Sequence, residues 1–376
     1  VFQTGDKGFK LKDVQDGSCT MADFVAQLSN EELEAISRGG YTMNHPLGAK
    51  GNAGIFGGVT ESLREKGIPP VVTTDGPSGI RIRPGRGVET TFFPCQTTMA
   101  QTWNLPLVKR LGKLLGEEVK ENNIGIWLSP ALNIHRNPLC GRNFEYFSED
   151  PLVAGRMSAG IVAGAKSEGL ITTIKHFVLN EQESHRNGIF TWADEQTLRE
   201  IYLKAFELSI KEGGSDGVMS AYNRLGTDWC GGCSELLNDL LRTEWGYDGY
   251  VISDYSSNMT GTGYMSPVVA VYNGNDTMLT GLWLISMPSH IIEMQKAYNN
   301  DPIGFGTALR EACRNIMIVK MKTKAFLEPS EDAPYLTDLF IKPEDWEWTE
   351  PNIVSTIKYV VSNVVNTVIL VVRIIM

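Results

Sequence analysis

The sequence lacks several motifs that would assign it to a common class of enzyme. It has no GxxxxGK[ST] phosphate loop, and no GxGxxG follows an early strand-like run. Its five histidines, at positions 45, 135, 176, 185 and 290, do not recur at the spacing of metal ligands. These absences argue against a nucleotide-binding enzyme and a zinc enzyme, and we expect neither a metal nor any other cofactor.

Cysteine and clustered positive charge are also scarce. Six cysteines in 376 residues are too few for a disulfide-dense secreted domain. Cys230 and Cys233 form a CGGC motif, but no second pair accompanies them, so the motif is interpreted as a loop. The formal net charge is −10 and the Lys and Arg residues are scattered, which argues against a nucleic-acid partner and suits a neutral substrate.

What the sequence contains is a regular alternation of two kinds of segment. Short apolar runs rich in β-branched residues predict strands within 67–77, 123–136, 170–177, 216–223 and 248–255. Amphipathic stretches between them predict helices at 105–123, 195–214 and 234–246. Before the first run, the segment 20–40 has helical spacing, a plausible cap at Ser29 and a Gly pair as its stop.

This alternation predicts the fold class. Strand followed by helix over about 260 residues is typical of a parallel sheet with helical crossovers, and of a (β/α)8 TIM-type barrel in particular. Six or seven units can be counted rather than eight, so the barrel is expected to be irregular. We predict lead-in helices at 1–60, a catalytic barrel at 61–325 and a C-terminal extension at 326–376. A doubly wound open sheet is the alternative.

Polar side chains follow the apolar runs, at the points where the predicted strands end. Examples are Asp75, Lys175, His176, Tyr222 and Asp254, the last in the short stretch YVISDY. The catalytic groups of a β/α barrel lie at the carboxyl ends of its strands. We therefore expect these side chains to form a ring around one mouth of the barrel. Such a set, with aromatic residues beside it, suits the recognition of a sugar.

Five segments in this order resemble glycoside hydrolase family 3, the β-glucosidase-like retaining enzymes. They are TDGPSGIR (74–81), GRNFEYFSEDP (141–151), IKHFVLNEQESHR (174–186), VMSAYN (218–223) and VISDY (251–255). The resemblance covers about 75 to 255. The region before it is similar to members of the family in which the domain order is reversed.

The resemblance also implies roles for particular residues. Asp254 is implied to be the nucleophile that forms a covalent glycosyl-enzyme. Asp75 is implied to accept hydrogen bonds from the distal hydroxyl groups of the sugar. The remaining substrate-binding residues implied in this way are Arg81, Arg142, Lys175, His176, Arg186, Met219 and Tyr222.

The resemblance does not identify the acid/base that a retaining glycosidase needs. In this family that carboxyl usually lies on a separate α/β sandwich domain, and no βαβ pattern appears in the residues that follow Asp254. One subgroup uses a His–Asp pair within KHFPGHG…DSH instead, but this chain reads KHFVLNEQESHR. The N-acetylglucosaminidase subgroup is therefore disfavoured, and a sandwich domain or a second chain is expected as a partner.

The expected function is hydrolysis of terminal non-reducing β-D-glucosyl or similar residues, with a small carbohydrate as substrate. The alternative is a non-catalytic sugar-binding barrel, or an inactive fragment without its acid/base domain. The start VFQTGDKGFK has neither an initiator Met nor a signal-peptide pattern, so a processed chain or a fragment in the cytoplasm or at a membrane is favoured over a secreted one. Residues 353–376 are long and apolar enough to be a membrane anchor, but their two charges and two asparagines favour a docked helix or strand.

Overall fold

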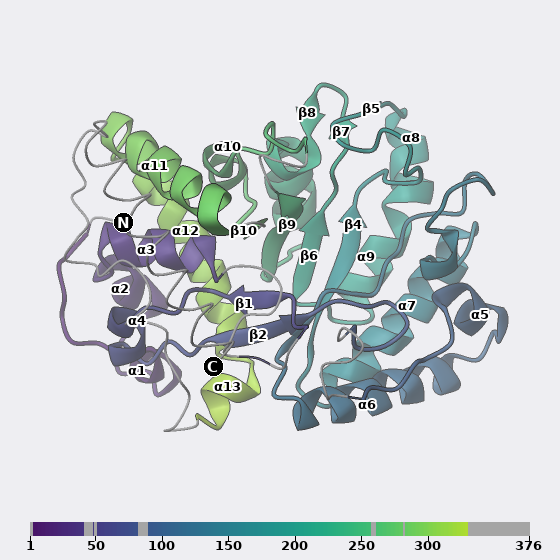
Figure 1. Ribbon diagram of the computed structural model, residues 1–376, viewed down its shortest axis with the longest axis horizontal. Coiled ribbons are helices and arrows are strands. Elements are labelled where there is room, and N and C mark those ends of the chain that lie inside the picture. Colours follow the sequence, from purple (N-terminus) through teal and green to yellow (C-terminus); the bar gives the residue numbers. More distant parts are fainter. Residues whose placement is uncertain are drawn as a thin grey trace.

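A single curled sheet organises the fold. The computed structural model describes residues 3–40, 48, 51–81, 89–256, 261–280 and 283–329 (Figure 1). Within these residues seven strands pair in the order β1-β2-β3-β4-β6-β9-β10, and only β1 is antiparallel to its neighbour. The strands are β1 (Gly54–Phe56), β2 (Val71–Thr74), β3 (Ile126–Trp127), β4 (Ile171–Phe177), β6 (Gly217–Ser220), β9 (Tyr250–Ser256) and β10 (Thr277–Thr280).

The strand order identifies the architecture. Neighbours in the sheet follow one another along the chain, so the order never reverses as it does at the switch point of a doubly wound sheet. Helices connect the parallel strands, and the sheet curls as it does in a TIM-type barrel. The prediction of an irregular barrel is confirmed and the open-sheet alternative is wrong. A small second sheet contains β5 (Phe190–Thr191), β7 (Arg224–Leu225) and β8 (Asp228–Trp229).

The helices fall into three groups along the chain. Those before β2 are α1 (Leu11–Gln15), α2 (Met21–Ala26), α3 (Asn30–Arg38) and α4 (Glu61–Glu65). Those between β2 and β9 are α5 (Gln96–Gln101), α6 (Leu105–Glu121), η1 (Asn143–Glu145), α7 (Pro151–Lys166), α8 (Glu195–Thr197), η2 (Leu198–Tyr202), α9 (Lys204–Lys211), η3 (Cys230–Gly232) and η4 (Glu235–Glu244). Those that follow are α10 (Pro267–Tyr272), α11 (Trp283–Asn300), α12 (Gly304–Lys320) and α13 (Lys324–Leu327).

Local sequence explains where the crossover helices begin. The Asn104 side chain accepts a hydrogen bond from Leu107 N and caps α6, and Asp150 caps α7 in the same way. A proline stands in the first turn of each helix, where its missing N–H costs nothing. The stretch 20–40 forms two helices rather than one, because Ser29 and Glu32 make a capping box that starts α3 separately.

The end of α3 joins the two edge strands of the sheet. Ser37 Oγ donates to Asp276 O at 2.9 Å, beside β10. Shortly after, the chain reaches β1, where Gly40 N donates to Ile55 O at 2.8 Å. Helix α3, predicted as part of a lead-in, therefore links the two edges of the curled sheet. Strand β1 also begins at Gly54, inside the segment 1–60 that was predicted to contain lead-in helices. The predicted domain limits stay predictions.

The faces of the strands alternate between two cores. Ile174, Val218 and Val251 point outward into a cluster with the crossover helices. Tyr250 and Ile252 belong to a second cluster that fills the barrel and extends to α2, α3 and α12. Asp254 follows two residues after Ile252, so it shares the inward face and stands where the strand reaches the mouth.

The structure does not test the prediction for the apolar tail. Residues 353–376, predicted as an anchor or a docked element, lie outside the described residues. In the part of the chain that the structure describes, no helix combines the length and the apolar character needed to cross a membrane.

Candidate active site

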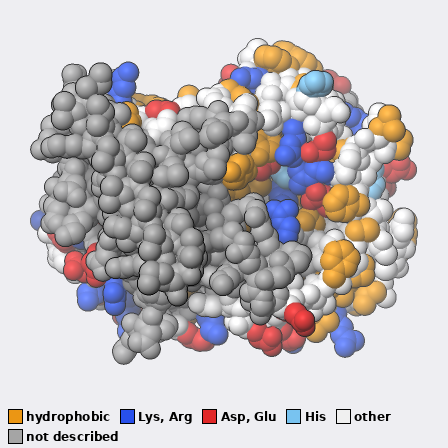
Figure 2. Space-filling view, viewed as in Figure 1, with side chains coloured by type: hydrophobic (Ala, Val, Ile, Leu, Met, Phe, Trp, Pro, Cys, Tyr) orange, Lys and Arg blue, Asp and Glu red, His pale blue; other side chains and the backbone are white. Residues whose placement is uncertain are grey.

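The candidate site lies at the carboxyl ends of four parallel strands. Asp75 follows β2, Lys175 and His176 stand near the end of β4, Tyr222 follows β6, and Asp254 stands near the end of β9. Figure 2 shows acidic and basic side chains gathered on this part of the surface, over the region of β4 and β6. The ring of polar groups predicted from the strand ends is therefore present.

Asp75 binds two basic side chains at one edge of the ring. Its Oδ1 lies 2.6 Å from Lys175 Nζ and accepts a hydrogen bond from Gly76 N at 2.9 Å. Its Oδ2 lies 2.5 Å from Arg81 Nη2. Burial alone would raise the pKa of Asp75, but the charges of Lys175 and Arg81 outweigh it and lower that pKa to about 2. Asp75 is thus a permanent anion near neutral pH.

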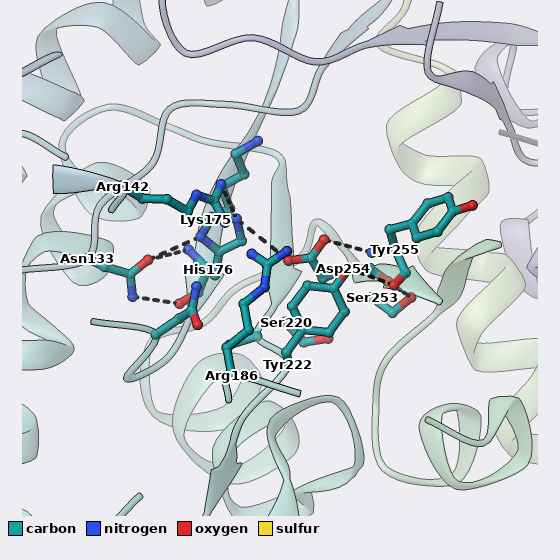
Figure 3. Close-up of polar contacts among 12 residues, drawn as sticks. Asn133, Arg142, Lys175, His176, Arg186, Ser220, Tyr222, Ser253, Asp254 and Tyr255 are labelled. Atoms are coloured by element: carbon teal, nitrogen blue, oxygen red, sulfur yellow. Dashed lines mark hydrogen bonds and ion pairs between the residues drawn. The ribbon is translucent and has the colours of Figure 1, made fainter. Parts of the chain in front are cut away.

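His176 occupies the centre of the ring and is buried. Its Nε2 lies 3.1 Å from Arg142 Nη2 and 3.6 Å from Asp254 Oδ2 (Figure 3). Burial and the nearby charges of Arg142, Lys175 and Arg186 hold the pKa of His176 well below its usual range. The imidazole is therefore neutral, and its approach to Asp254 is a contact rather than an ion pair.

Asp254 is buried among cations, and only one of its oxygens is hydrogen-bonded by the described residues. Oδ1 accepts from Tyr255 N at 2.7 Å, whereas Oδ2 has no hydrogen-bond partner in the described part of the chain. Burial raises the pKa of Asp254, and the charges of Arg142 and Arg186 only partly offset it. Nearby cations thus lower the pKa of Asp75, but at Asp254 they do not outweigh burial.

Arg186 and Tyr222 cover the same side of Asp254. The Arg186 guanidinium lies over the Tyr222 ring, with Cζ 4.6 Å from the ring centroid. The Tyr222 hydroxyl donates to Tyr255 O at 2.7 Å, and its pKa is raised by burial and by the charge of Asp254. The hydroxyl hydrogen is committed to a backbone carbonyl, which fixes the ring beside the carboxylate.

Glu183 is a site residue that the sequence interpretation missed. Its carboxylate joins the two arginines of the site, at 2.9 Å from Arg186 Nη1 and 3.8 Å from Arg142 Nη1. Burial raises the pKa of Glu183, with the charge of Asp254 acting in the same direction. A further carboxylate, Glu145, lies 2.5 Å from Arg142 Nε.

Asn133 and Glu181 were also missed. Asn133 is fully buried in the loop after β3 and bonds to His176, and Glu181 is buried behind it. Both residues stand inside segments already singled out for other reasons, NIHR and NEQE. A polar residue within an otherwise apolar stretch was the available signal, but only the folded chain shows what it contacts.

Met219 is the last of the predicted site residues, and two aromatic side chains, Tyr255 and Trp103, differ in their exposure. Met219 is buried in the cluster that fills the barrel, level with Lys175 and Ile252. Tyr255 is half-buried next to Asp254, whereas Trp103 is 75% exposed just before α6. Among the residues that the structure describes, no group of three His, Cys, Asp or Glu side chains is arranged to hold a metal ion.

The chain matches a known family over most of its length. The model of the glycosyl hydrolase family 3 N-terminal domain matches residues 10–294. The chain is 46% identical over 249 residues to a β-glucosidase A of Butyrivibrio fibrisolvens, covering 65% of this chain and 29% of that protein. It is 42% identical over 260 residues to a β-glucosidase of Ruminococcus albus, covering 69% of this chain and 27% of that protein.

Solved structures show the same fold. A β-glucosidase from Paenibacillus barengoltzii superposes with a TM-score of 0.79 at 38% identity, over 87% of this chain and 36% of that one. A β-glucosidase 3B from Thermotoga neapolitana, in complex with glucose, superposes with a TM-score of 0.74 at 36% identity, over 84% of this chain and 44% of that one. The chain thus spans less than a third of the two curated relatives and less than half of the two solved structures.

Proposed function

Because this chain belongs to glycosyl hydrolase family 3, we propose that it hydrolyses terminal non-reducing β-D-glucosyl, or similar β-glycosyl, residues. The substrate is a small carbohydrate, and the reaction is a retaining double displacement. Asp254 attacks the anomeric carbon while the glycosidic bond breaks and the leaving oxygen takes a proton from a general acid. Water then cleaves the ester between Asp254 and the sugar.

The geometry of Asp254 is the single observation that carries this proposal. Its Oδ1 is held by Tyr255 N, while Oδ2 has no hydrogen-bond partner among the described residues and stands at the mouth of the barrel. A carboxylate oxygen that is oriented but otherwise unbound can approach an anomeric carbon. The arginines beside it favour the ionised form that the attack requires.

The other residues of the ring are proposed to bind the sugar. Asp75 stays ionised and accepts hydrogen bonds from distal hydroxyls, while Lys175 and Arg81 orient it and donate to the same part of the ring. Arg142, His176 and Arg186 lie beside Asp254 and are proposed to bind the remaining hydroxyls, the two arginines as donors. Tyr222 and Met219 are proposed to line the floor of the pocket.

The acid/base is proposed to come from outside the described residues, on an α/β sandwich domain or on a second chain. The short coverage of the relatives supports this, because they are more than three times as long as the matched segment. Glu183 is the carboxylate that shares the arginines of Asp254, but it is engaged by both of them. These contacts hold its carboxylate against the arginines, so Glu183 is not proposed as the proton donor although burial raises its pKa.

The first experiment is a burst assay with an aryl β-glucoside that has a very good leaving group. Such a substrate needs little acid assistance, so the nucleophile can be tested without its partner. We expect a burst from the chain and none from Asp254→Ala. Asp301→Asn alters a half-buried carboxylate outside the ring, which accepts a hydrogen bond from Gly304 N, and this matched control should keep the burst.

Azide then separates a nucleophile from a structural carboxylate. In Asp254→Ala the small anion can enter the space left by the side chain and attack the sugar directly, giving an α-glucosyl azide by a single inversion. Recovery of release with this product supports the proposed role. Glucose binding without any release from the unaltered chain would instead favour the sugar-binding alternative.

A further inference from the structure

Asn133 makes four contacts that fix its amide in one orientation. Its Oδ1 accepts from His176 N at 2.9 Å, and its Nδ2 donates to His176 O at 3.0 Å. A backbone N–H can only donate and a carbonyl can only accept, so the oxygen and nitrogen of the amide are assigned without ambiguity. The same Oδ1 lies 3.2 Å from His176 Nδ1 (Figure 3).

This orientation determines the tautomer of His176. Because Asn133 presents an acceptor to Nδ1, that ring nitrogen carries the proton, and Nε2 of the neutral ring is left with its lone pair. The lone pair accepts from Arg142 Nη2 at 3.1 Å. Asn133 thereby positions an arginine of the site through the histidine, without facing the mouth itself.

Glu181 stands on the other side of Asn133. It is 1% exposed, and its Oε1 accepts from Asn133 Nδ2 and from Ile134 N, each at 3.3 Å. Its Oε2 has no hydrogen-bond partner among the described residues. When Glu181 is ionised, its charge polarises the amide, makes Asn133 Oδ1 a stronger acceptor and increases the electron density on His176 Nε2.

We propose that Asn133 and Glu181 are positioning residues that hold His176 in its Nδ1–H form, and that the charge of Glu181 regulates how firmly Arg142 is held at the site. This deepens the proposed function and rests on it as far as catalysis is concerned. Neither residue is proposed to touch the substrate, since both are buried behind the histidine.

Glu181, Asn133 and His176 form a relay to Arg142, and Glu181 is the member of this relay that titrates near neutral pH. Burial raises the pKa of Glu181 to about 7, with Arg136 acting against it. Among the described residues, the thiols of Cys140 and Cys230 also act on Glu181, and burial raises their pKa values. His176, linked to Glu181 through Asn133, has a pKa that is held low. All three stay neutral near neutral pH, while Glu181 loses its charge as the pH falls through about 7.

The direct test measures the 15N chemical shifts of the two ring nitrogens of His176 by NMR, in protein labelled with 15N-histidine. The His176→Gln variant assigns the signals. We expect a protonated Nδ1 and an unprotonated Nε2, with the Nε2 shift moving around pH 7. Glu181→Gln keeps an acceptor oxygen but cannot ionise, so that movement should disappear. An Nε2–H tautomer, or a titration unchanged in Glu181→Gln, would overturn the proposal. No substrate is needed, so this result is independent of whether the chain hydrolyses glycosides.

The kinetic test uses kcat/KM for the activated aryl β-glucoside between about pH 6 and 8. A carboxyl with a pKa of about 7 is roughly one-tenth ionised at pH 6, so a fall of up to about tenfold from pH 8 is expected. In Glu181→Gln the fall should shrink by the share due to this group. Glu34→Gln, the same change in a buried carboxyl paired with Arg38 and His290, is the matched control and should leave the profile unchanged. A profile that moves equally in both variants would contradict the relay.

Discussion

Lys175 Nζ lies 2.6 Å from Asp75 Oδ1, although β3 separates β4, which carries Lys175, from β2, which Asp75 follows. The pair can form because the sheet curls and both side chains point inward at its carboxyl edge. Each residue is otherwise remote from the other, since they stand 100 positions apart along the chain. The contact therefore ties two non-adjacent strands at the place where the sugar is proposed to bind.

Asp75→Asn tests the proposed contact with the distal hydroxyls. The amide keeps the shape but loses the charge, and one of its two ends becomes a donor. We expect kcat/KM for the aryl β-glucoside to fall by about 100-fold or more, because charge-assisted hydrogen bonds are lost. For a substrate without the 4-hydroxyl, the same substitution should lower kcat/KM far less. Equal losses for both substrates would contradict a contact with that hydroxyl.

The stability of the protein should depend on Asp75 at acid pH. The folded-state pKa of about 2 lies below the unfolded value near 3.9, so the contribution of Asp75 is present above about pH 5 and is lost as the pH falls toward 2. The shift corresponds to about 2–3 kcal/mol. Urea unfolding at about pH 7 and pH 3 should show a smaller pH difference for Asp75→Asn than for the unaltered chain. An identical difference in both would contradict the assigned ion pairs.

Lys320 predicts a pH dependence of the same sign, but at neutral to alkaline pH. It is completely buried, donates to Gly57 O at 2.9 Å and to Pro69 O at 2.6 Å, and burial lowers its pKa to about 7. Between about pH 7 and 10 the unfolded chain binds one more proton at this lysine than the folded chain does. The free energy of unfolding should therefore rise with pH by up to about 1.4 kcal/mol per unit from this residue.

Lys320→Met removes that contribution and should flatten the dependence. Other groups also titrate in this range, so the measurement is the difference between variant and unaltered chain in urea unfolding at several pH values. Lys296→Met, on the exposed side of α11, is the matched control. Parallel curves for all three proteins would show that Lys320 does not titrate as described.

Gly39→Ala tests the close approach of the end of α3 to the edge strand β1. Gly39 ends α3 with a φ of +70°, and a Cβ there would lie 2.8 Å from Ile55 O on β1. Gly17 has a similar φ of +76°, but a Cβ at Gly17 would meet nothing within 4 Å. Gly17→Ala should cost only the left-handed conformation, about 1 kcal/mol, whereas Gly39→Ala should cost about 1–3 kcal/mol more. Thermal unfolding of the two variants measures the difference, and equal losses of stability would contradict the close approach to β1.

The local features of the chain could be predicted because neighbouring residues decide them. The strands within 170–177 and 248–255, the helix at 105–123 and the cap at Ser29 all follow from periodicity and short-range hydrogen bonding. The strand ends were informative as well. A charged residue that follows an inward-facing apolar run, such as Asp254, is expected to lie at the mouth of the barrel.

The tertiary structure decided what depends on contacts between distant segments. The sequence by itself determined the barrel class and most members of the polar ring, since each is encoded within one strand and its end. Three features arise only when segments distant in the sequence are buried together. They are the contact of Ser37 with Asp276 between the sheet edges, the opposite pKa shifts of Asp75 and Asp254, and the links from Glu181 through Asn133 to His176. Burial and the distance between charges set these properties, and neither quantity is written in the order of the residues.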